Sequence, residues 1–221
     1  MIKGEKHMKL EILERDGLTL YAGTVEEVRQ GTGNLEGRVV FVKLGGKVWN
    51  REANQEEDAS VEIGFWNPTD PTGDWQNLAT RIYESGITTG SFLSVLCRKS
   101  ENHINAVRFK RSGIWNFPAS DDGEMKERNV IIGTMASMKE KDDGSVRFSV
   151  PIYHGQDADT EWVYVTFRNS QYGNMADRTK VCLSPKNGQH VKALLVCGPK
   201  SEYGNDDSPA VFYSGYRFEI I

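Results

Sequence analysis

Two large aromatic side chains, Trp162 and Tyr164, interrupt an otherwise apolar β-pattern in DTEWVYVTF (159–167). Side chains alternate along a strand, which places three apolar residues on one side: Val163, Val165 and Phe167. The two aromatic rings then lie on the side expected to meet water. Every base has a π-face, so rings at a strand surface can stack with bases without reading their sequence, at about 1 to 3 kcal/mol per base. Packing against a loop or a partner subunit is the alternative role for these rings.

Two groups of cations are candidates for phosphate contact. In KVWNR (47–51), expected in an exposed loop, Lys47 and Arg51 flank Trp49 and favour both phosphate contact and cation-π stacking. The second group falls on an expected hairpin and forms a basic stripe: Arg98, Lys99, Arg108, Lys110 and Arg111. A solvated face without a ligand is the alternative for this stripe.

The sequence contains no recognisable catalytic or metal-binding pattern. Its histidines are scattered without the spacing of metal ligands: His7, His103, His154 and His190. No phosphate-binding loop, nucleophile elbow or dinucleotide fingerprint occurs. An acidic run is expected in a solvated loop before a strand: Glu56, Glu57 and Asp58. We therefore expect no enzyme activity, no metal and no cofactor, with a nucleic-acid enzyme such as a nuclease as a third alternative.

The composition is that of a soluble globular protein, with 38% hydrophobic and 26% charged residues in 221. No apolar run approaches the roughly 18 residues of a membrane span, and the N-terminal sequence lacks the apolar core of a secretory signal. We expect a cytoplasmic protein that does not bind membranes. The cysteines, odd in number and without CxxC spacing, are expected to be reduced and mostly buried: Cys97, Cys182 and Cys197. The net charge is -4, and neither half of the chain on either side of Ser120 is a basic nucleic-acid tail, although a local basic groove is compatible with this balance.

The chain repeats itself in five segments that keep one order. GTVEEVRQGTGNLEGRVVFVKLGG (23–46) resembles GTMASMKEKDDGSVRFSVPIYHG (133–155), and SVEIGFWN (60–67) aligns with WVYVTFRN (162–169). The other matches are NLATRIYESGITTG (77–90) with NMADRTKVCLSPKNG (174–188), CRKSE (97–101) with CGPKSE (197–202), and AVRFKRSGIWNF (106–117) with AVFYSGYRFEII (210–221). We predict a domain duplication with four parts: an extension at 1–17, domain 1 at 18–119, a linker at 120–128 and domain 2 at 129–221.

Each copy reads as three strands, one helix and two strands. The first helix is predicted to begin after a cap at Asp74 and to end at Gly86. Its apolar residues recur at helical spacing: Trp75, Leu78, Ala79 and Ile82. The second helix is expected around 174–181. The predicted fold class is all-β with one short helix per domain, as two tandem OB-folds. These five-stranded Greek-key barrels commonly bind oligonucleotides or oligosaccharides.

The second copy resembles the bacterial single-stranded DNA-binding proteins. TEWVYVTF (160–167) looks like their Thr-Glu-Trp-led third strand, and PKNGQHVKALLVCG (185–198) looks like their Lys-Gly-containing entry into strand four. The resemblance covers 130–221 and, more faintly, 20–117. It implies a charged groove with aromatic platforms that binds single strands with low sequence specificity in replication, repair or recombination. Single-stranded RNA is an alternative ligand.

The resemblance also implies positions for the aromatic platforms. Trp162 matches the family's stacking tryptophan, and Tyr203 lies in a hairpin where the family places another aromatic. Tyr153 and Trp49 end or follow the second strands, where a further aromatic is common. The remaining candidates for the same interface are Tyr164, Lys200 and Trp66.

The sequence departs from the family pattern in two ways. It ends in YRFEII rather than in an acidic tail with a terminal Pro-Phe, which puts the family's partner recruitment in doubt. It also has two divergent domains where typical members have one and form tetramers, so by analogy a homodimer would supply four OB-folds. The alternative function is an interaction module whose OB-folds bind a protein or a saccharide.

Overall fold

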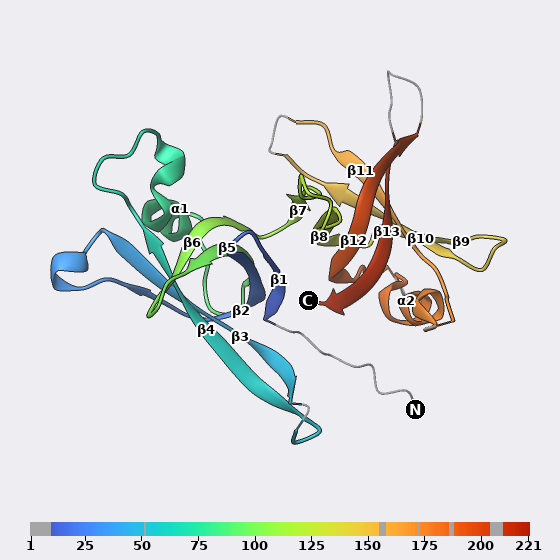
Figure 1. The fold of residues 1–221 in the computed structure, drawn as a ribbon, viewed down its shortest axis with the longest axis horizontal. Helices are drawn as coiled ribbons and strands as arrows, with labels where there is room; N and C mark the ends of the chain where they lie inside the picture. Colours follow the sequence, from blue (N-terminus) through green and yellow to red (C-terminus); the bar gives the residue numbers. More distant parts are fainter. Residues whose placement is uncertain (1–9, 51, 155–157, 172, 186–187, 204–209) are drawn as a thin grey trace. The chain divides into compact units, whose positions relative to one another are not determined.

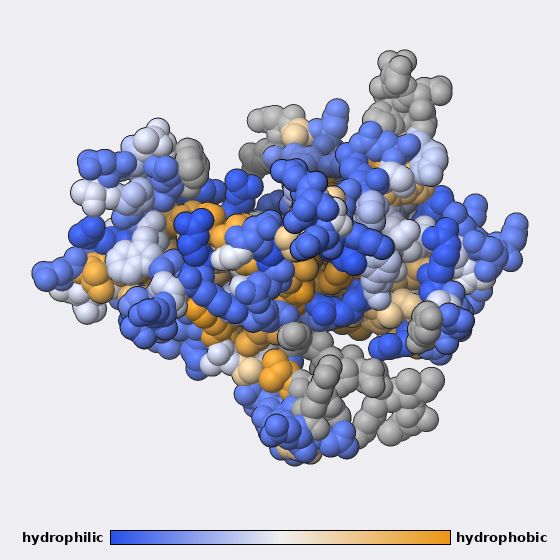
Figure 2. All heavy atoms as spheres, in the orientation of Figure 1, coloured by the Kyte–Doolittle hydropathy of each residue, from blue (hydrophilic) through white to orange (hydrophobic). Residues whose placement is uncertain are grey.

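The computed structural model describes residues 10–50, 52–154, 158–171, 173–185, 188–203 and 210–221, without the side chains of Trp49 and Trp75. The chain divides into two compact units at the bond between Arg111 and Ser112, which we call barrel 1 and barrel 2. Within the described ranges, no helix is long and apolar enough to cross a membrane. Hydrophilic residues cover most of the surface in view in Figure 2, and apolar residues show only in smaller areas between them.

Barrel 1 consists of β1 (Glu11–Arg15), β2 (Leu18–Gln30), β3 (Val39–Asn50), β4 (Gln55–Trp66), β5 (Phe92–Lys99), β6 (Ile104–Lys110), the helix α1 (Leu78–Glu84) and the 3-10 turns η1 (Gly33–Leu35) and η2 (Asp74–Gln76). Its strand order is β1-β2-β3-β4-β6-β5, and β5 pairs again with β2, which closes the sheet (Figure 1). The pairing of β4 with β6 is parallel. Five strands closed in this order, with a helix between the third and fourth, define an OB-fold. Strand β1 is an addition, antiparallel to β2.

Barrel 2 consists of β7 (Gly113–Phe117), β8 (Arg128–Thr134), β9 (Ser137–Glu140), β10 (Val146–Ile152), β11 (Glu161–Phe167), β12 (Lys192–Tyr203), β13 (Ala210–Ile220) and the helix α2 (Met175–Leu183). Its strand order is β7-β8-β12-β13-β11-β10-β9. Strands β8 and β9 are two halves of one OB-fold strand, since β8 pairs with β12 and β9 with β10. The pairing of β11 with β13 is parallel, as in barrel 1. The predicted fold class, two tandem OB-fold barrels, is confirmed.

The boundary between the units differs from the predicted linker at 120–128. Strand β7 pairs with β8, with Trp115 opposite Val130, so 113–117 belongs to barrel 2. The predicted extension at 1–17 likewise includes β1, which pairs with β2. The repeat visible in the sequence starts at the first barrel strand, whereas each unit begins one strand earlier. That extra strand has little sequence similarity between the copies, so the pattern did not reveal it.

The inward residues of the third strand are equivalent in the two barrels. Ile63 and Phe65 in β4 and three residues of β11 are completely buried: Val163, Val165 and Phe167. In each barrel a phenylalanine of the fifth strand packs edge-on against the buried phenylalanine of the third strand. The ring centroids are 5.7 Å apart for Phe109 and Phe65, and 6.3 Å apart for Phe218 and Phe167. The predicted inward alternation is confirmed, although Val61 is only partly buried.

The helices repeat a second contact with the same rings. The guanidinium of Arg81 in α1 lies 5.6 Å from the Phe109 ring, and that of Arg178 in α2 lies 6.0 Å from the Phe218 ring. The two arginines are paired in the predicted alignment of the helices. Their common cation-π contact supports that alignment.

The predicted alignment of the last strands is wrong by several residues. It placed Ala106 over Ala210, but the equivalent buried cysteines set a different register. Cys97 pairs with Ala106 in barrel 1, and Cys197 pairs with Gly215 in barrel 2. The common core therefore aligns VRFK (107–110) with YRFE (216–219). Both stretches contain apolar alternation, so sequence pattern alone could not choose between the two alignments.

Equivalent asparagines cap both helices from the end of the third strand. Asn67 Oδ1 accepts the backbone N–H of Thr80 at 3.2 Å, and Asn169 Oδ1 accepts that of Ala176 at 2.8 Å. Each satisfies a donor that the first helical turn leaves without an intrahelical partner. The predicted cap, Asp74, belongs instead to η2, and α1 begins at Leu78.

A different hairpin extends beyond the barrel in each unit (Figure 1). In barrel 1, β3 pairs with β2 only as far as Gly45, and the β3–β4 ribbon continues to Asn50. KVWNR was predicted in a loop, but Lys47 to Asn50 are part of β3, and the acidic run at 56–58 is part of β4. In barrel 2 the extended hairpin is β12–β13, whose register continues to Tyr203.

Candidate nucleic-acid interface

The outward face of β11 places Trp162 and Tyr164 as predicted, on the side away from the core. Trp162 is 47% exposed. Tyr164 is partly buried because its ring stacks on Phe212 of the neighbouring strand β13, with centroids 5.2 Å apart and ring planes 25° apart. The parallel register sets Tyr164 directly beside Phe212.

An aromatic cluster forms around Phe212. Tyr203, at the end of β12, is 69% exposed and lies edge-on to Phe212 at 5.6 Å. The guanidinium of Arg147, in β10, lies 4.7 Å from the centroid of the same ring. We call Arg147, Tyr164, Tyr203 and Phe212 the Phe212 cluster. It joins a cation to three rings on one outward face, a combination that suits a phosphate backbone with unstacked bases.

Sequence reasoning missed Phe212 and Arg147. The alternation of buried Val146 and Phe148 around Arg147 could have identified the arginine as outward. Phe212 lies in the apolar run AVFY, where no alternation marks the outward residue. Only the pairing of β13 with β11 reveals its place beside Tyr164.

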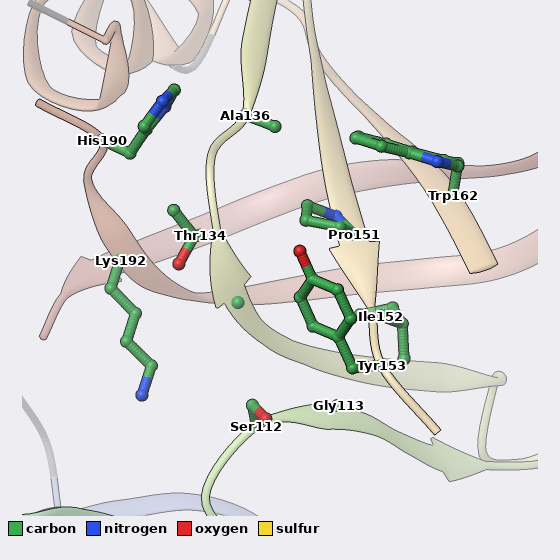
Figure 3. A pocket seen from close by; sticks show the side chains of 11 residues that line it. Ser112, Gly113, Thr134, Ala136, Pro151, Ile152, Tyr153, Trp162, His190 and Lys192 are labelled. Atoms are coloured by element: carbon green, nitrogen blue, oxygen red, sulfur yellow. The ribbon is translucent and has the colours of Figure 1, made fainter. Parts of the chain in front are cut away.

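Tyr153 and Trp162 meet at a second place on barrel 2. Tyr153, the residue after β10, is 72% exposed. Trp162 pairs with Pro151 across the β10–β11 ladder, and all three residues line one groove of about 450 Å³ (Figure 3). The structure thus brings two predicted aromatics together at this groove.

Lys200 lies on the other side of its hairpin from the Phe212 cluster. Its partner in the β12–β13 ladder is the buried Tyr213, whereas Ser201 is the partner of Phe212. Directly opposite residues of a ladder share a face. The Lys200 ammonium also pairs with Glu202. The placement of Lys200 therefore gives no support to its predicted part in the nucleic-acid interface.

The equivalent face of barrel 1 has a different chemistry. The third-strand alignment places Ser60 where barrel 2 has Trp162, and Glu62 where it has Tyr164. Glu62 forms a salt bridge with Arg29 at 2.9 Å, and the Arg29 guanidinium lies 4.1 Å from the ring of Phe41. The negative charge of the Glu62 carboxylate, beside Phe41 and Arg29, would repel a phosphate backbone on this face.

Trp66 is the exposed tryptophan of that face, with 37% of its surface accessible. Its indole Nε1 donates a hydrogen bond of 2.9 Å to Asn105 Oδ1, and its ring lies edge-on to Phe41 at 6.4 Å. These contacts fix the ring against barrel 1. A base would have to stack on its remaining free surface.

The β3–β4 ribbon pairs its predicted contacts with acids. Lys47 is opposite Asp58, and Trp49 is opposite Glu56. Since opposite residues share a face, the negative charges lie beside the predicted phosphate contact. Arg51 and the side chain of Trp49 are outside the described residues.

The predicted basic stripe of barrel 1 is a row of exposed cations except at Lys110. The exposed members are Arg98, Lys99, Arg108 and Arg111. Lys99 lies 3.2 Å from Glu11, and hydrogen bonds to Tyr21 and Glu11 raise the pKa of its ammonium. Arg111 donates to the Ser85 carbonyl at 3.3 Å.

Lys110, the fifth member of the stripe, is partly buried opposite Ser94. Burial lowers the pKa of its ammonium, and the nearby Arg108 lowers it further. Lys110 and Arg108 share a face, as the alternation predicted. The like charges repel one another, so an anion between them would be favoured.

The cysteines are free thiols. Cys97 and Cys197 are buried in the two cores and Cys182 is partly buried. Burial raises the pKa of the Cys97 and Cys197 thiols, which makes them poor nucleophiles. In the part of the chain that the structure describes, no group of three or more His, Cys, Asp or Glu residues could hold a metal ion.

Comparisons with known proteins give a weak likeness of fold. No protein-family model matches the chain, and no curated protein matches it in sequence. Two crystal structures of Rim1, a mitochondrial single-stranded DNA-binding protein from S. cerevisiae, match with a TM-score of 0.30. Their identities are 11% for the selenomethionine-labelled form and 10% for the other, each over 42% of this chain and 92% of Rim1. At that TM-score the OB-fold assignment rests on the strand order and register alone.

Proposed function

We propose that this chain binds single-stranded DNA with low sequence specificity through the outward face of barrel 2. The observation that supports the proposal best is the gathering of aromatic side chains on that face: Trp162, Tyr153, Tyr203 and the stacked pair of Tyr164 and Phe212. In OB-folds the second and third strands commonly present the ligand-binding face, and here these are β10 and β11. The low specificity follows because stacking does not distinguish bases by their hydrogen-bonding edges.

The electrostatics of barrel 2 are compatible with this ligand despite the net charge of -4. Arg147 contributes a guanidinium to the Phe212 cluster, and its register partner on β9 is Lys139. Two cations on one face can contact neighbouring phosphates. Because so few phosphate contacts are expected, the affinity should depend only modestly on salt, with a slope of log affinity against log salt of about -0.7 per phosphate contacted in a single strand.

The proposed cellular role is protection or organisation of single strands in replication, repair or recombination. The homodimer with four barrels stays a prediction, which light scattering would test. Single-stranded RNA is the competing ligand of the same chemistry. Aromatic rings also stack with sugars, so a saccharide ligand is the competing class.

The test is a titration of the full chain with oligo-dT at low salt, followed by tryptophan fluorescence. We expect quenching that weakens as salt is added, because Trp162 stacks with a base and cations contact phosphates. Trp162→Phe should keep most of the affinity, measured by anisotropy of a labelled oligo-dT, while losing much of the quenching. Parallel titrations with oligo-rU and with a linear oligosaccharide separate the competing ligands. Absence of oligo-dT binding at low salt would exclude the proposed function.

A further inference from the structure

The groove beside Trp162 lies where the first strand of barrel 2 is interrupted. Strand β8 ends at Thr134 and β9 begins at Ser137, and the two residues between them turn the chain. The buried Met135 fixes this turn, since its N–H donates to the Val191 carbonyl at 2.8 Å. The groove has a volume of about 450 Å³, and the exposed Trp162 and Tyr153 are among its lining residues. This size lies within the range of about 300 to 1,000 Å³ that small-ligand sites occupy.

The two walls of the groove differ in chemistry (Figure 3). One wall consists of the indole of Trp162, the ring of Pro151 and the phenol of Tyr153. The opposite wall contains His190 and Lys192, and Thr134 lies between the walls. An apolar, aromatic wall suits a base, whereas an imidazole and an ammonium suit an anion.

Backbone and side-chain contacts hold the polar wall in place. A hydrogen bond of 3.0 Å joins His190 Nδ1 to the Met135 carbonyl, so Nδ1 is the donor and carries a proton. Its other nitrogen, Nε2, can donate a hydrogen bond to an anion when the ring is protonated. Lys192, at the start of β12, is paired with Thr134 in the ladder. The ladder thereby positions the lysine at the groove.

We propose that this groove holds one nucleotide of a bound single strand, with its base against Trp162 and Tyr153 and its phosphate at Lys192 and His190. The proposal rests on the proposed function and names a specific subsite within it. Trp162 is thereby the base contact of an anchored nucleotide rather than an isolated platform. From the groove the strand continues along β11 to Tyr164 and the Phe212 cluster.

The spacing of the aromatics sets the conformation of the strand along this path. Trp162 and Tyr164 are two residues apart on one strand, a distance of about 6.6 Å. Stacked bases in one strand are about 3.4 Å apart. Bases on these two rings must therefore separate from each other, and an anchored phosphate at one end opposes their return to a stacked helix.

The test compares variants of the polar wall in the full chain. Lys192→Gln removes the ammonium and His190→Gln removes the imidazole, and the glutamine at 190 keeps a donor for the Met135 carbonyl. The matched control is Lys180→Gln, which removes an exposed lysine of α2 in the same barrel. Circular dichroism and denaturant unfolding establish that each variant is folded.

We expect Lys192→Gln to lower the affinity for oligo-dT about tenfold at low salt, because a charge-assisted contact is lost. The slope of log affinity against log salt should fall by about 0.7 in magnitude, and the control should change neither quantity. A second probe is dTMP against thymidine. The wild type should prefer dTMP, and Lys192→Gln should lose most of that preference.

If folded Lys192→Gln and His190→Gln both keep the wild-type affinity and salt slope, the subsite is overturned and the proposed function stays intact. Equal binding of dTMP and thymidine by the wild type would also overturn it. Failure of the wild type to bind oligo-dT at low salt would instead exclude the proposed function, and the subsite with it.

Discussion

Barrel 1 and barrel 2 have the same inner contacts and different outer ones. Phe65 and Phe167 are both completely buried against a phenylalanine of the fifth strand. On the outward side of the same strand, barrel 1 has Glu62 in a salt bridge with Arg29, whereas barrel 2 has Tyr164 stacked on Phe212. Interiors are close-packed, so a change of one methylene there is costly, while exposed positions tolerate change. The two barrels thus share one fold and differ in the chemistry of their surfaces.

The extended hairpins follow the same division. The β3–β4 ribbon of barrel 1 has an acidic run at 56–58, and the β12–β13 hairpin of barrel 2 has Tyr203 and Phe212. The first repels a phosphate backbone and the second offers rings to bases. The difference predicts that barrel 2 is the main binding site and barrel 1 contributes less.

The largest expected effect is on binding by barrel 2. Trp162→Ala should weaken oligo-dT binding by about 5- to 150-fold, which corresponds to the 1 to 3 kcal/mol of a stacked base. The matched change at the equivalent position of barrel 1, Ser60→Ala, should have no effect. Fluorescence anisotropy with labelled oligo-dT measures both. Equal losses in the two variants would contradict the division between the barrels.

The second effect is on alkaline stability. Burial raises the pKa of Tyr213 to about 12 from 10.0, so the fold favours the neutral phenol. Below pH 10 both folded and unfolded chains bind this proton, and stability is unaffected. Between pH 10 and 12 the unfolded chain loses it first, and at pH 11 the free energy of unfolding should be about 1.4 kcal/mol lower on this account.

Tyr213→Phe should remove that part of the alkaline loss, measured by denaturant unfolding at pH 9 and pH 11. The equivalent residue of barrel 1 is Ile104, by the register of the fifth strands, so barrel 1 has no such group. Tyr83→Phe, at an exposed tyrosine of α1, is the control. An unchanged pH dependence in Tyr213→Phe would show that this phenol does not contribute.

The third effect is on the shared helix caps. Asn67→Ala and Asn169→Ala each remove an acceptor for a first-turn N–H and should lower the free energy of unfolding by about 1 kcal/mol. Asn116→Ala, at an exposed asparagine of β7, should change it little. Thermal unfolding measures all three. A lower free energy of unfolding in only one of the two cap variants would mean that the cap does not stabilise both barrels alike.

The smallest effect is a gain in barrel 1. Glu62→Gln removes a negative charge and releases Arg29 from its salt bridge. In the Trp162→Ala background, residual oligo-dT affinity should rise about twofold, since exposed ion pairs contribute roughly 0.2 to 1 kcal/mol. Glu84→Gln on α1 removes the same charge elsewhere and is the control. An equal gain in affinity from the control would show that the gain comes from the change in net charge and not from this face of barrel 1.

The sequence predicted the core better than the site. Period-two alternation identified Ile63, Phe65 and the inward residues of β11 because burial selects for it directly. The repeat identified Asn67 with Asn169 and Arg81 with Arg178, although their roles as caps and ring contacts appeared only in the structure. Similar local packing kept similar residues at these positions.

The sequence by itself determined two tandem OB-folds and the outward position of Trp162 and Tyr164. Strand alternation and the order of elements are local properties, and a local pattern specifies them. Only the tertiary structure decided that Phe212 stacks on Tyr164, that Lys200 faces the other side of its hairpin, and that Trp162 shares a groove with Lys192. These relations depend on the register of strands distant in sequence, and a shift of one residue would reverse every side chain.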